Sequence, residues 1–331
     1  MMQTRPAGVD EFLEAAGWGG AEIAPLEGDA SFRRYFRIRR GDDRAMLMDA
    51  PPPHEDPRPF LHVGKWLGDN GLRAPRIYAE NADRGLVLIE DFGHDRMRDW
   101  LDDNPAEERR AYADAIDALV ALHRCPPGPF DPYSLETYLK EVSLFPDWFC
   151  PAAGIEVDGM GFLAAWREAL APLLLRQQPG VTVLRDYHAE NIMLLGERGE
   201  YTGEQGLIDF QDALVGHPAY DLVSLLQDAR RDVSTDLESE MLDRYRQAMA
   251  PDAEFEADYA RLGAQRNAKI VGIFARLWKR DDKPRYLAMI PRVWEAMERD
   301  LAHPALEPVA RWFDANVPED MRAARGGGLA E

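Results

Sequence analysis

The hydrophobic pattern of the chain changes its period near residue 93. Before that point, short apolar runs and alternating apolar and polar positions predominate, which is typical of strands with one buried face. In residues 33–40 (RRYFRIRR), Phe36 and Ile38 alternate with Arg37 and Arg39. This alternation predicts a half-buried strand with an exposed basic face. The same approach predicts further elements in this region: strands over 44–50 and 86–93, and helices over 8–17 and 59–70.

Beyond residue 93 the pattern is helical. Residues 107–123 carry apolar side chains at steps of four and three, which predicts a long helix with one buried stripe (Ala111, Ala115, Leu119 and Leu122). His123 is interpreted as a surface or capping histidine, because a ring near a helix end can interact with the helix dipole. Further helices are predicted over 133–149, 161–175, 272–279 and 286–297.

Two short segments carry residue types that suit phosphoryl transfer. Residues 184–191 read LRDYHAEN, and residues 208–212 read IDFQD. Moving the terminal phosphoryl group of ATP to a hydroxyl requires a carboxylate beside the attacking oxygen and oxygen ligands for magnesium. Asp186 fits the first requirement, and Asn191 and Asp209 fit the second. Asn191 follows Asp186 by five positions, which is the spacing of the protein-kinase catalytic loop.

These side chains also have a purely structural interpretation, because Asp and Asn in turns commonly cap helices or close the turn themselves. Apolar runs at 181–184 and 206–210, however, place each motif at the end of a strand, on either side of a hairpin through 192–195. The acid and the metal ligands are therefore predicted to converge. Their order and spacing favour the catalytic interpretation.

Together with GHPAYDL at 216–222, the two segments resemble the motif of the aminoglycoside phosphotransferase family of small-molecule kinases. The resemblance implies an α+β, protein-kinase-like two-lobed fold. A small lobe of antiparallel sheet plus helix would bind the nucleotide and span 1–92, ending in the hinge. A large, mostly helical lobe would span 93–331 and carry the catalytic loop and the acceptor site. The implied cofactors are ATP and Mg²⁺, and Asp221 is interpreted as a buried cap that holds the catalytic loop by its backbone N–H groups.

Within that family, the chain is most similar to bacterial sugar kinases of cell-wall recycling, which phosphorylate N-acetylmuramate and N-acetylglucosamine at the anomeric hydroxyl. Six segments carry this closer likeness: 28–35 (GDASFRRY), 48–52 (MDAPP), 144–149 (LFPDWF), 208–213 (IDFQDA), 221–226 (DLVSLL) and 273–287 (IFARLWKRDDKPRYL). The implied acceptor is an amino sugar. Two other interpretations stay open: a kinase of the same family acting on an aminoglycoside or another metabolite alcohol, and an ATP-binding module without turnover.

The resemblance also implies binding residues. The turn at 26–32 would lie over the nucleotide phosphates, and the end of the strand at 86–93 would form the hinge beside the adenine. The nucleotide-binding residues expected on this basis are Gly28, Ser31, Phe32, Arg33, Arg34, Glu90 and Phe92. The residues expected at the acceptor are Asp186, His188, Trp148 and Arg276. His188 has a second interpretation as a brace of the loop, and Trp148, with Phe145 and Phe149, has one as a core residue.

One part of the kinase site is missing. The strand at 44–50 would carry the lysine that binds phosphates in protein kinases, yet Met48 stands about where that lysine belongs. A methionine cannot bind phosphate. Either an arginine from the preceding turn or strand compensates, or nucleotide binding is weakened. The helix predicted over 59–70 contains no convincing glutamate as a partner for such a cation.

Composition narrows the partners and the compartment. With 59 acidic and 39 basic residues, the formal net charge of −20 argues against nucleic-acid and anionic-membrane partners, which attract basic surfaces. The charge does not choose between acceptors. The 331 residues suffice for two lobes, no apolar run is long enough to span a membrane, and two cysteines form no disulfide framework. A cytoplasmic protein is therefore predicted.

Overall fold

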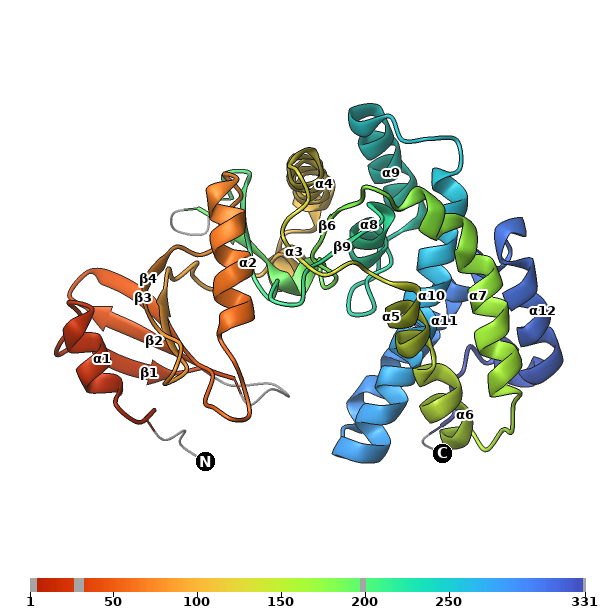
Figure 1. The fold of residues 1–331 in the computed structure, drawn as a ribbon, viewed down its shortest axis with the longest axis horizontal. Helices are drawn as coiled ribbons and strands as arrows, with labels where there is room; N and C mark the ends of the chain where they lie inside the picture. Colours follow the sequence, from red (N-terminus) through yellow and green to blue (C-terminus); the bar gives the residue numbers. More distant parts are fainter. Residues whose placement is uncertain (1–4, 27–32, 197–200, 330–331) are drawn as a thin grey trace. The chain divides into compact units, whose positions relative to one another are not determined.

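The structure is a computed structural model in which residues 5–26, 33–196 and 201–329 are described. The chain folds into two compact units (Figure 1). The first comprises Met1–Pro105 and Asn191–Ala213, and the second comprises Ala106–Glu190 and Leu214–Glu331. The chain therefore passes from the second unit to the first between Glu190 and Asn191, inside the predicted catalytic loop. We predicted from the sequence that the nucleotide-binding lobe ends at residue 92, and this boundary stays a prediction.

The first unit is built on a five-stranded antiparallel sheet with the strand order β1-β2-β3-β5-β4. Its strands are β1 (Glu22–Pro25), β2 (Arg34–Arg40), β3 (Asp43–Asp49), β4 (Ile77–Asn81) and β5 (Leu86–Ile89). As the alternation predicts, Phe36 and Ile38 of β2 are buried, and they share a core with Phe12 and Leu13 of helix α1 (Val9–Ala15). Helix α1 therefore covers this face of the sheet (Figure 1).

The other face of β2 differs from the prediction. Arg39 is exposed as expected, but Arg37 is only 7% exposed. Its Nε lies 2.7 Å from Asp91 Oδ2, and its Nη2 donates to the carbonyl oxygen of Gly93 at 2.8 Å. The expected exposure of Arg37 was wrong because its acidic partner lies 54 positions away, where an alternating pattern carries no signal.

Two helices and a hairpin complete the first unit: α2 (Arg58–Asp69), α3 (Met97–Asp103), β7 (Ile192–Leu195) and β8 (Glu204–Leu207). Strands β7 and β8 pair antiparallel with Ile192 opposite Leu207. The Leu207 N–H donates to the carbonyl of Arg73 at 2.8 Å, and the Phe210 ring stacks on Phe60 of α2 with centroids 5.0 Å apart. The end of the hairpin is therefore fixed against the rest of the first unit.

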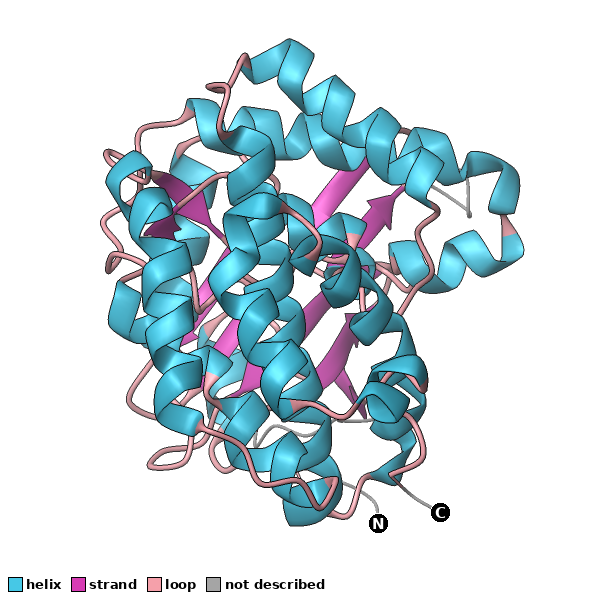
Figure 2. Cartoon of the chain, turned by 90° about the vertical axis from the view of Figure 1, so that its right-hand side faces the viewer, coloured by secondary structure: helices cyan, strands magenta, loops and turns pink. Residues whose placement is uncertain are grey.

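Helices predominate in the second unit (Figure 2). They are α4 (Glu108–Arg124), α5 (Leu135–Val142), α6 (Cys150–Ala152), α7 (Gly159–Arg176), α8 (Ala219–Leu226), α9 (Thr235–Met249), α10 (Phe255–Asp281), α11 (Ile290–Leu301), α12 (Glu307–Asn316) and α13 (Glu319–Ala323). The short strands β6 (Val181–Val183) and β9 (Leu214–Gly216) pair with each other in this unit. It also contains the 3₁₀ turns η4 (Pro284–Met289) and η5 (Pro304–Leu306), whereas η1 (Pro105–Glu107) and η3 (Ala189–Asn191) lie at the borders between the units. Ser134 and Ser234 begin α5 and α9 by accepting hydrogen bonds from backbone N–H groups of the first turn. The predicted α+β class, with one sheet-based and one mostly helical part, is confirmed.

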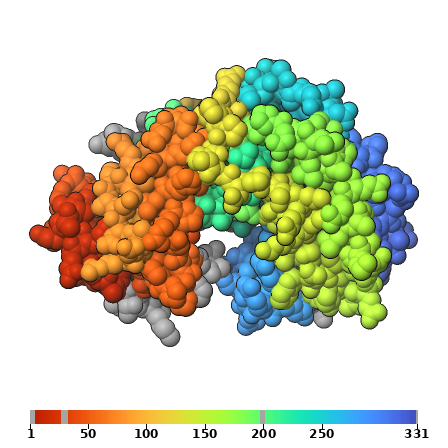
Figure 3. Space-filling model, in the orientation of Figure 1, coloured from red at the N-terminus to blue at the C-terminus, as the bar shows by residue number. Residues whose placement is uncertain are grey.

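Helix α10 runs through the middle of the second unit and contacts α5, α7, α8 and α11 (Figure 1). It lies beside the segment that contains α5 and the π-helical turn η2 (Phe145–Phe149) (Figure 3). The prediction of a single helix over 133–149 was wrong, because the helical turn widens to a π-helix at η2. Gly272 of α10 permits the close approach: a Cβ there would lie 2.3 Å from the Leu144 backbone.

In the second unit, one further expectation is wrong, and one of two open interpretations is selected. His123 is not a surface or capping residue but is 5% exposed, with its Nδ1 2.8 Å from the Tyr245 hydroxyl of α9. Phe145 and Phe149 are fully buried among the rings of Trp294 and its neighbours and belong to the core. Of the helices that the structure describes, none is both long and apolar enough to cross a bilayer.

Candidate active site

A buried carboxylate shapes the backbone of the predicted catalytic loop. Asp221 of α8 is fully buried and accepts hydrogen bonds from the backbone N–H of Leu184 at 2.7 Å and of Arg185 at 2.8 Å. Arg185 has φ 71°, a left-handed conformation that a non-glycine residue keeps only when its surroundings hold it. The ion pair between its guanidinium and Glu141 adds to that hold. The predicted role of Asp221 as a cap of this loop is confirmed.

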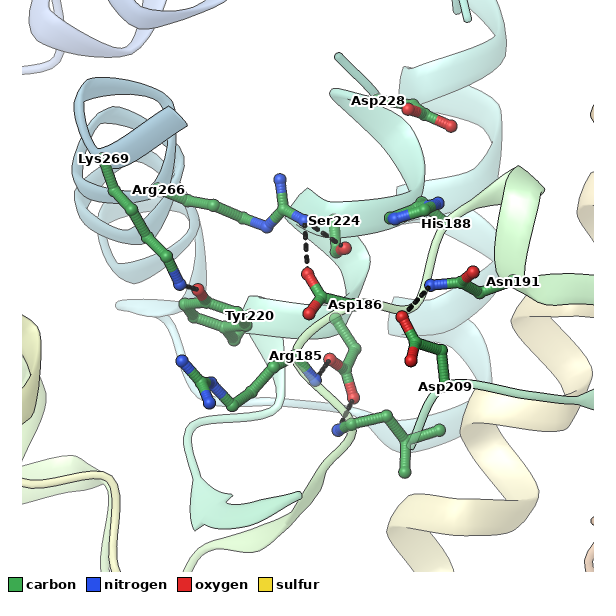
Figure 4. Close-up of polar contacts among 12 residues, drawn as sticks. Arg185, Asp186, His188, Asn191, Asp209, Tyr220, Ser224, Asp228, Arg266 and Lys269 are labelled. Atoms are coloured by element: carbon green, nitrogen blue, oxygen red, sulfur yellow. Dashed lines mark hydrogen bonds and ion pairs between the residues drawn. The ribbon is translucent and has the colours of Figure 1, made fainter. Parts of the chain in front are cut away.

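Asp186 follows this turn and is presented beside two cations of α10 (Figure 4). Arg266 Nη2 lies 3.6 Å from Asp186 Oδ1 and donates to Ser224 Oγ at 2.8 Å. The Arg266 side chain is 5% exposed, whereas that of Asp186 is 47% exposed and so accessible to a ligand. Close packing acts to raise the pKa of Asp186, but the charges of Arg266 and then Lys269 outweigh it and hold the pKa below its ordinary value. Asp186 is therefore an ionised carboxylate, the state a proton acceptor needs.

The middle of the loop is tied to the segment that follows α8. The Ala189 N–H donates to Asp228 at 3.3 Å, and His188 Nε2 lies 3.2 Å from Arg230 Nη1. Arg230 also pairs with Glu190, with 2.9 Å between Nε and Oε2. His188 is 4% exposed, and burial lowers its pKa, so the ring is neutral at pH 7. This setting favours the interpretation of His188 as a brace, and its contact with an acceptor stays a prediction.

Asn191 and Asp209 meet at the open end of the β7–β8 hairpin. Because Ile192 is opposite Leu207, the residues just outside that pair are neighbours. Asn191 Nδ2 lies 3.3 Å from Asp209 Oδ2 (Figure 4), and Gln211 Nε2 donates to Asp209 Oδ1 at 2.8 Å. Asp209 has φ 59°, which Asp tolerates better than most residues. Both side chains carry the oxygen donors that Mg²⁺ prefers.

The described part of the chain contains no group of three or more His, Cys, Asp or Glu side chains that could enclose a metal. Mg²⁺ in phosphoryl-transfer sites is commonly held by one or two protein oxygens, with phosphate oxygens and water completing its shell. The pair at the hairpin end fits this mode, once the Asn191 amide turns its oxygen toward the cation.

The predicted hinge is braced by Arg73. Its Nη1 and Nη2 donate to the Glu90 carboxylate at 2.8 and 2.7 Å, and its guanidinium lies 4.6 Å from the centroid of the Phe92 ring. The hydrogen bonds from Arg73 are the main cause that lowers the pKa of Glu90. The Glu90 N–H donates to the carbonyl of Arg76 at 2.9 Å, so a base bound here must use backbone groups beyond that N–H.

Other predicted nucleotide contacts lie near β2. Arg34 Nε donates to Asp49 Oδ2 at 2.9 Å, and Arg33 Nη2 lies 3.3 Å from Glu55 Oε2. The remaining predicted residues, Gly28, Ser31 and Phe32, lie outside the described residues.

Two residues predicted at the acceptor lie in or beside the packed pair η2 and α10. Trp148 of η2 is half-buried, unlike its neighbours Phe145 and Phe149. Arg276 of α10 is also half-buried, and in the described part of the chain its guanidinium has neither an ion-pair nor a hydrogen-bond partner. It lies two turns beyond Lys269, whose Nζ is 2.9 Å from Glu141 Oε1. Residues seven apart share a helix face, so Arg276 and Lys269 project from the same side of α10.

Sequence reasoning missed several residues of this site: Arg266 and Lys269 beside the predicted base, Glu55 beside Arg33, and Arg73 beside the hinge. Each lies far along the chain from its partner. Arg266, for example, is 80 positions beyond Asp186. Only the basic residues of 266–280 at helical spacing, recurring on one face, could have pointed to such a role.

Comparison with known proteins agrees with this geometry. Residues 22–264 match the model of the family described as "Phosphotransferase enzyme family". The chain belongs to this family. Among its relatives, it is 36% identical to an N-acetylmuramate/N-acetylglucosamine kinase from Caulobacter vibrioides, with 96% of this chain and 98% of the relative covered. It is 38% identical to a kinase of the same name from Pseudomonas aeruginosa, with 95% and 94% covered.

Two solved kinase structures share the fold. The choline kinase LicA from Streptococcus pneumoniae has a TM-score of 0.61 at 13% identity, over 92% of this chain and 98% of that protein. The aminoglycoside phosphotransferase APH(2'')-IIa, solved as a ternary complex with streptomycin and ATP, has a TM-score of 0.61 at 16% identity, over 93% and 99%. The expected protein-kinase-like fold is thus confirmed, and the chain is a kinase.

Proposed function

We propose that this kinase transfers the γ-phosphoryl group of ATP to the anomeric hydroxyl of N-acetylmuramate and of N-acetylglucosamine, in the cytoplasm. The acceptor is supported by relatives of that name that are 36% and 38% identical over nearly the whole chain. The chemistry is supported above all by one observation: an ionised carboxylate, Asp186, is held beside Arg266 in the loop that leads directly to Asn191.

In the reaction, the acceptor oxygen attacks the γ-phosphorus, the bond from that phosphorus to the oxygen of ADP breaks, and the acceptor proton passes to Asp186. Asp186 orients the hydroxyl and receives the proton as the new bond forms. Asn191 and Asp209 would hold Mg²⁺, which neutralises charge on the phosphates. Arg73 and Glu90 keep the hinge and Phe92 in position beside the adenine.

On the acceptor side, we assign Trp148 to stacking on the sugar. It is half-buried, whereas its neighbours Phe145 and Phe149 are buried in the core. Arg276 is suited to binding an anionic substituent, since it is half-buried and no carboxylate of the described residues forms an ion pair or hydrogen bond with its guanidinium. N-acetylmuramate carries a lactyl carboxylate that N-acetylglucosamine lacks. We assign the recognition of this carboxylate to Arg276, and the neutral sugar would bind without it.

An acceptor panel tests the function. ADP release is measured with N-acetylmuramate, N-acetylglucosamine, an aminoglycoside and choline, and ³¹P NMR identifies the phosphorylated position. We expect turnover of both amino sugars and an anomeric phosphate as the product. Asp186→Asn should lower kcat by ~10²-fold or more and leave ATP binding intact. Turnover of another alcohol with neither amino sugar would refute the acceptor. If neither the wild type nor Asp186→Asn forms product above background while both bind ATP, the result would instead favour the binding module without catalysis.

A further inference from the structure

A cation lies beside the position of the missing lysine. Tyr35 of β2 is paired with Met48 of β3, so the two side chains project from the same face of the sheet. The Tyr35 hydroxyl lies 3.7 Å from Met48 Sδ, and Tyr35 is also hydrogen-bonded to Arg33. Arg33 lies immediately before β2, and its hydrogen bond to Tyr35 places its guanidinium on this face. Its guanidinium reaches the surroundings of Met48 from the neighbouring strand.

The surroundings of Arg33 are acidic. Arg33 Nη2 lies 3.3 Å from Glu55 Oε2, and the two side chains are only 12% and 18% exposed. Burial acts to lower the pKa of Arg33, but Tyr35, Glu55 and Asp209 together raise it above the ordinary value. The predicted metal ligand Asp209 is thus close enough to act on this guanidinium.

The two neighbouring arginines of β2 are committed elsewhere. Arg34 projects from the opposite face, where its guanidinium lies 5.7 Å from the centroid of the core residue Phe36 and pairs with Asp49. Arg37 projects from the face of Met48, but it is buried against Asp91 and the Gly93 carbonyl. Of the three, Arg33 alone combines the correct face with a place near Asp209.

We propose that Arg33 binds the nucleotide phosphates in place of the lysine missing at position 48, and that Glu55 is the residue that positions it. The inference rests on the proposed function, because it assigns a role only in the presence of a nucleotide. In protein kinases the strand lysine is held by a glutamate of the following helix. Here the cation comes from the adjacent strand, and the acid lies just before α2. A guanidinium can also donate to two phosphate oxygens at once, which an ammonium does less well.

Steady-state kinetics with ATP as the varied substrate test this assignment. We expect Arg33→Met to lower kcat/KM for ATP by ~10²-fold, because a fixed charge beside the transferred group is lost. Glu55→Gln should lower it less, since the guanidinium stays but loses its orientation. Arg39→Met removes an exposed charge from the same strand and should leave kcat/KM within about twofold of the wild type. Thermal unfolding of each variant separates loss of function from loss of fold.

The sharpest test of the role of Arg33 is to introduce a lysine at position 48. Met48 is fully buried beside Tyr35, so Met48→Lys in the wild type places a second cation against Arg33 and should reduce activity. In the Arg33→Met background, the same substitution should raise kcat/KM at least tenfold. This reversal of sign in a double-mutant cycle is expected only if the two positions serve one role.

The outcomes separate this inference from the proposed function. Full activity in Arg33→Met, or a Met48→Lys substitution that is harmful in both backgrounds, would overturn the role of Arg33 while the kinase still phosphorylates amino sugars. If Arg33→Met does not fold, Arg33→Lys is used instead, because it keeps a charge with a different geometry. Retention of between a tenth and a half of the wild-type kcat/KM for ATP supports the assignment, and an unchanged kcat/KM contradicts it. If the wild type phosphorylates neither amino sugar, the proposed function itself is refuted.

Discussion

At the scale of single residues, the contact between Asp186 and Arg266 decides how the proposed base behaves with pH. Arg266 holds the pKa of Asp186 down, so Asp186 is ionised throughout the physiological range. Removing the cation should let the pKa of Asp186 rise, because close packing then acts without its main counterweight. A base works only when deprotonated, so the acid limb of the pH–rate profile should move to higher pH.

We therefore expect Arg266→Met to lose activity steeply between pH 8 and pH 5, where the wild type remains nearly flat. The measurement is kcat/KM for the acceptor across that range. Arg266→Lys retains the charge and should keep the wild-type profile, although at a lower rate because the bond to Ser224 is weakened. A uniform loss at every pH in Arg266→Met would mean that Arg266 supports only the fold.

Local spacing explains which site residues could be predicted from the sequence. Asp186 and Asn191 share one short sequence motif, and Asn191 and Asp209 flank one hairpin, so local order alone points to these three residues. Arg266 reaches Asp186, and Glu55 reaches Arg33, through tertiary packing within each unit, which no local pattern records. The sequence alone showed that position 48 carries a methionine instead of the phosphate-binding lysine. The cation proposed to replace that lysine could be identified only from the strand register in the structure.

At the scale of elements, α10 carries a basic face, which we assign to the proposed acceptor site. Lys269 is paired with Glu141, and Arg280 is paired with Asp281. Arg276, between them on the same face, lies ~10 Å along the axis from Lys269. We expect Arg276→Met to raise KM for N-acetylmuramate roughly tenfold or more, because a charge-assisted hydrogen bond is lost. KM for N-acetylglucosamine, which has no carboxylate, should change by less than about twofold.

The neutral sugar is the internal control, since a general disturbance of α10 would affect both acceptors. Arg280→Met removes an exposed charge from the same face and should change neither KM. If Arg276→Met raises KM equally for the two sugars, Arg276 does not bind the lactyl carboxylate.

The same helix shows why element prediction was incomplete. Only its second half was expected, over 272–279, whereas α10 begins at Phe255. Its first half buries Asp258 and Asn267 in polar contacts with Arg176 and Gln227. Buried polar residues break the apolar stripe on which periodicity depends, because their partners, rather than their own hydrophobicity, keep them inside. Helix α4, with an unbroken stripe, was predicted to within a residue at each end.

At the scale of the whole molecule, buried ionisable groups act on stability in opposite directions. Burial raises the pKa of Asp221 to about 7 and that of Asp300 well above its ordinary value. As the pH falls, these carboxyls become protonated at a higher pH in the folded state than in the unfolded state. They therefore increase the free energy of unfolding as the pH falls from 7. Burial and the nearby His217 lower the pKa of His123 to about 3. The unfolded state then binds a proton that the folded state refuses, so His123 disfavours folding as the pH falls below 6.5.

Because these effects partly cancel in the wild type, the contribution of His123 is visible only as a difference between variants. His123→Gln keeps a polar partner for the Tyr245 hydroxyl but does not titrate. We expect this variant to be less stable at pH 7.5, with the gap to the wild type narrowing by about 1 kcal/mol at pH 5.5. Urea unfolding followed by the fluorescence of the buried Trp166 and Trp294 measures it, at high salt so that the net charge of −20 is screened equally at both pH values. A gap that is constant with pH would mean that His123 titrates with the same pKa in the folded and unfolded states, and that burial does not lower its pKa.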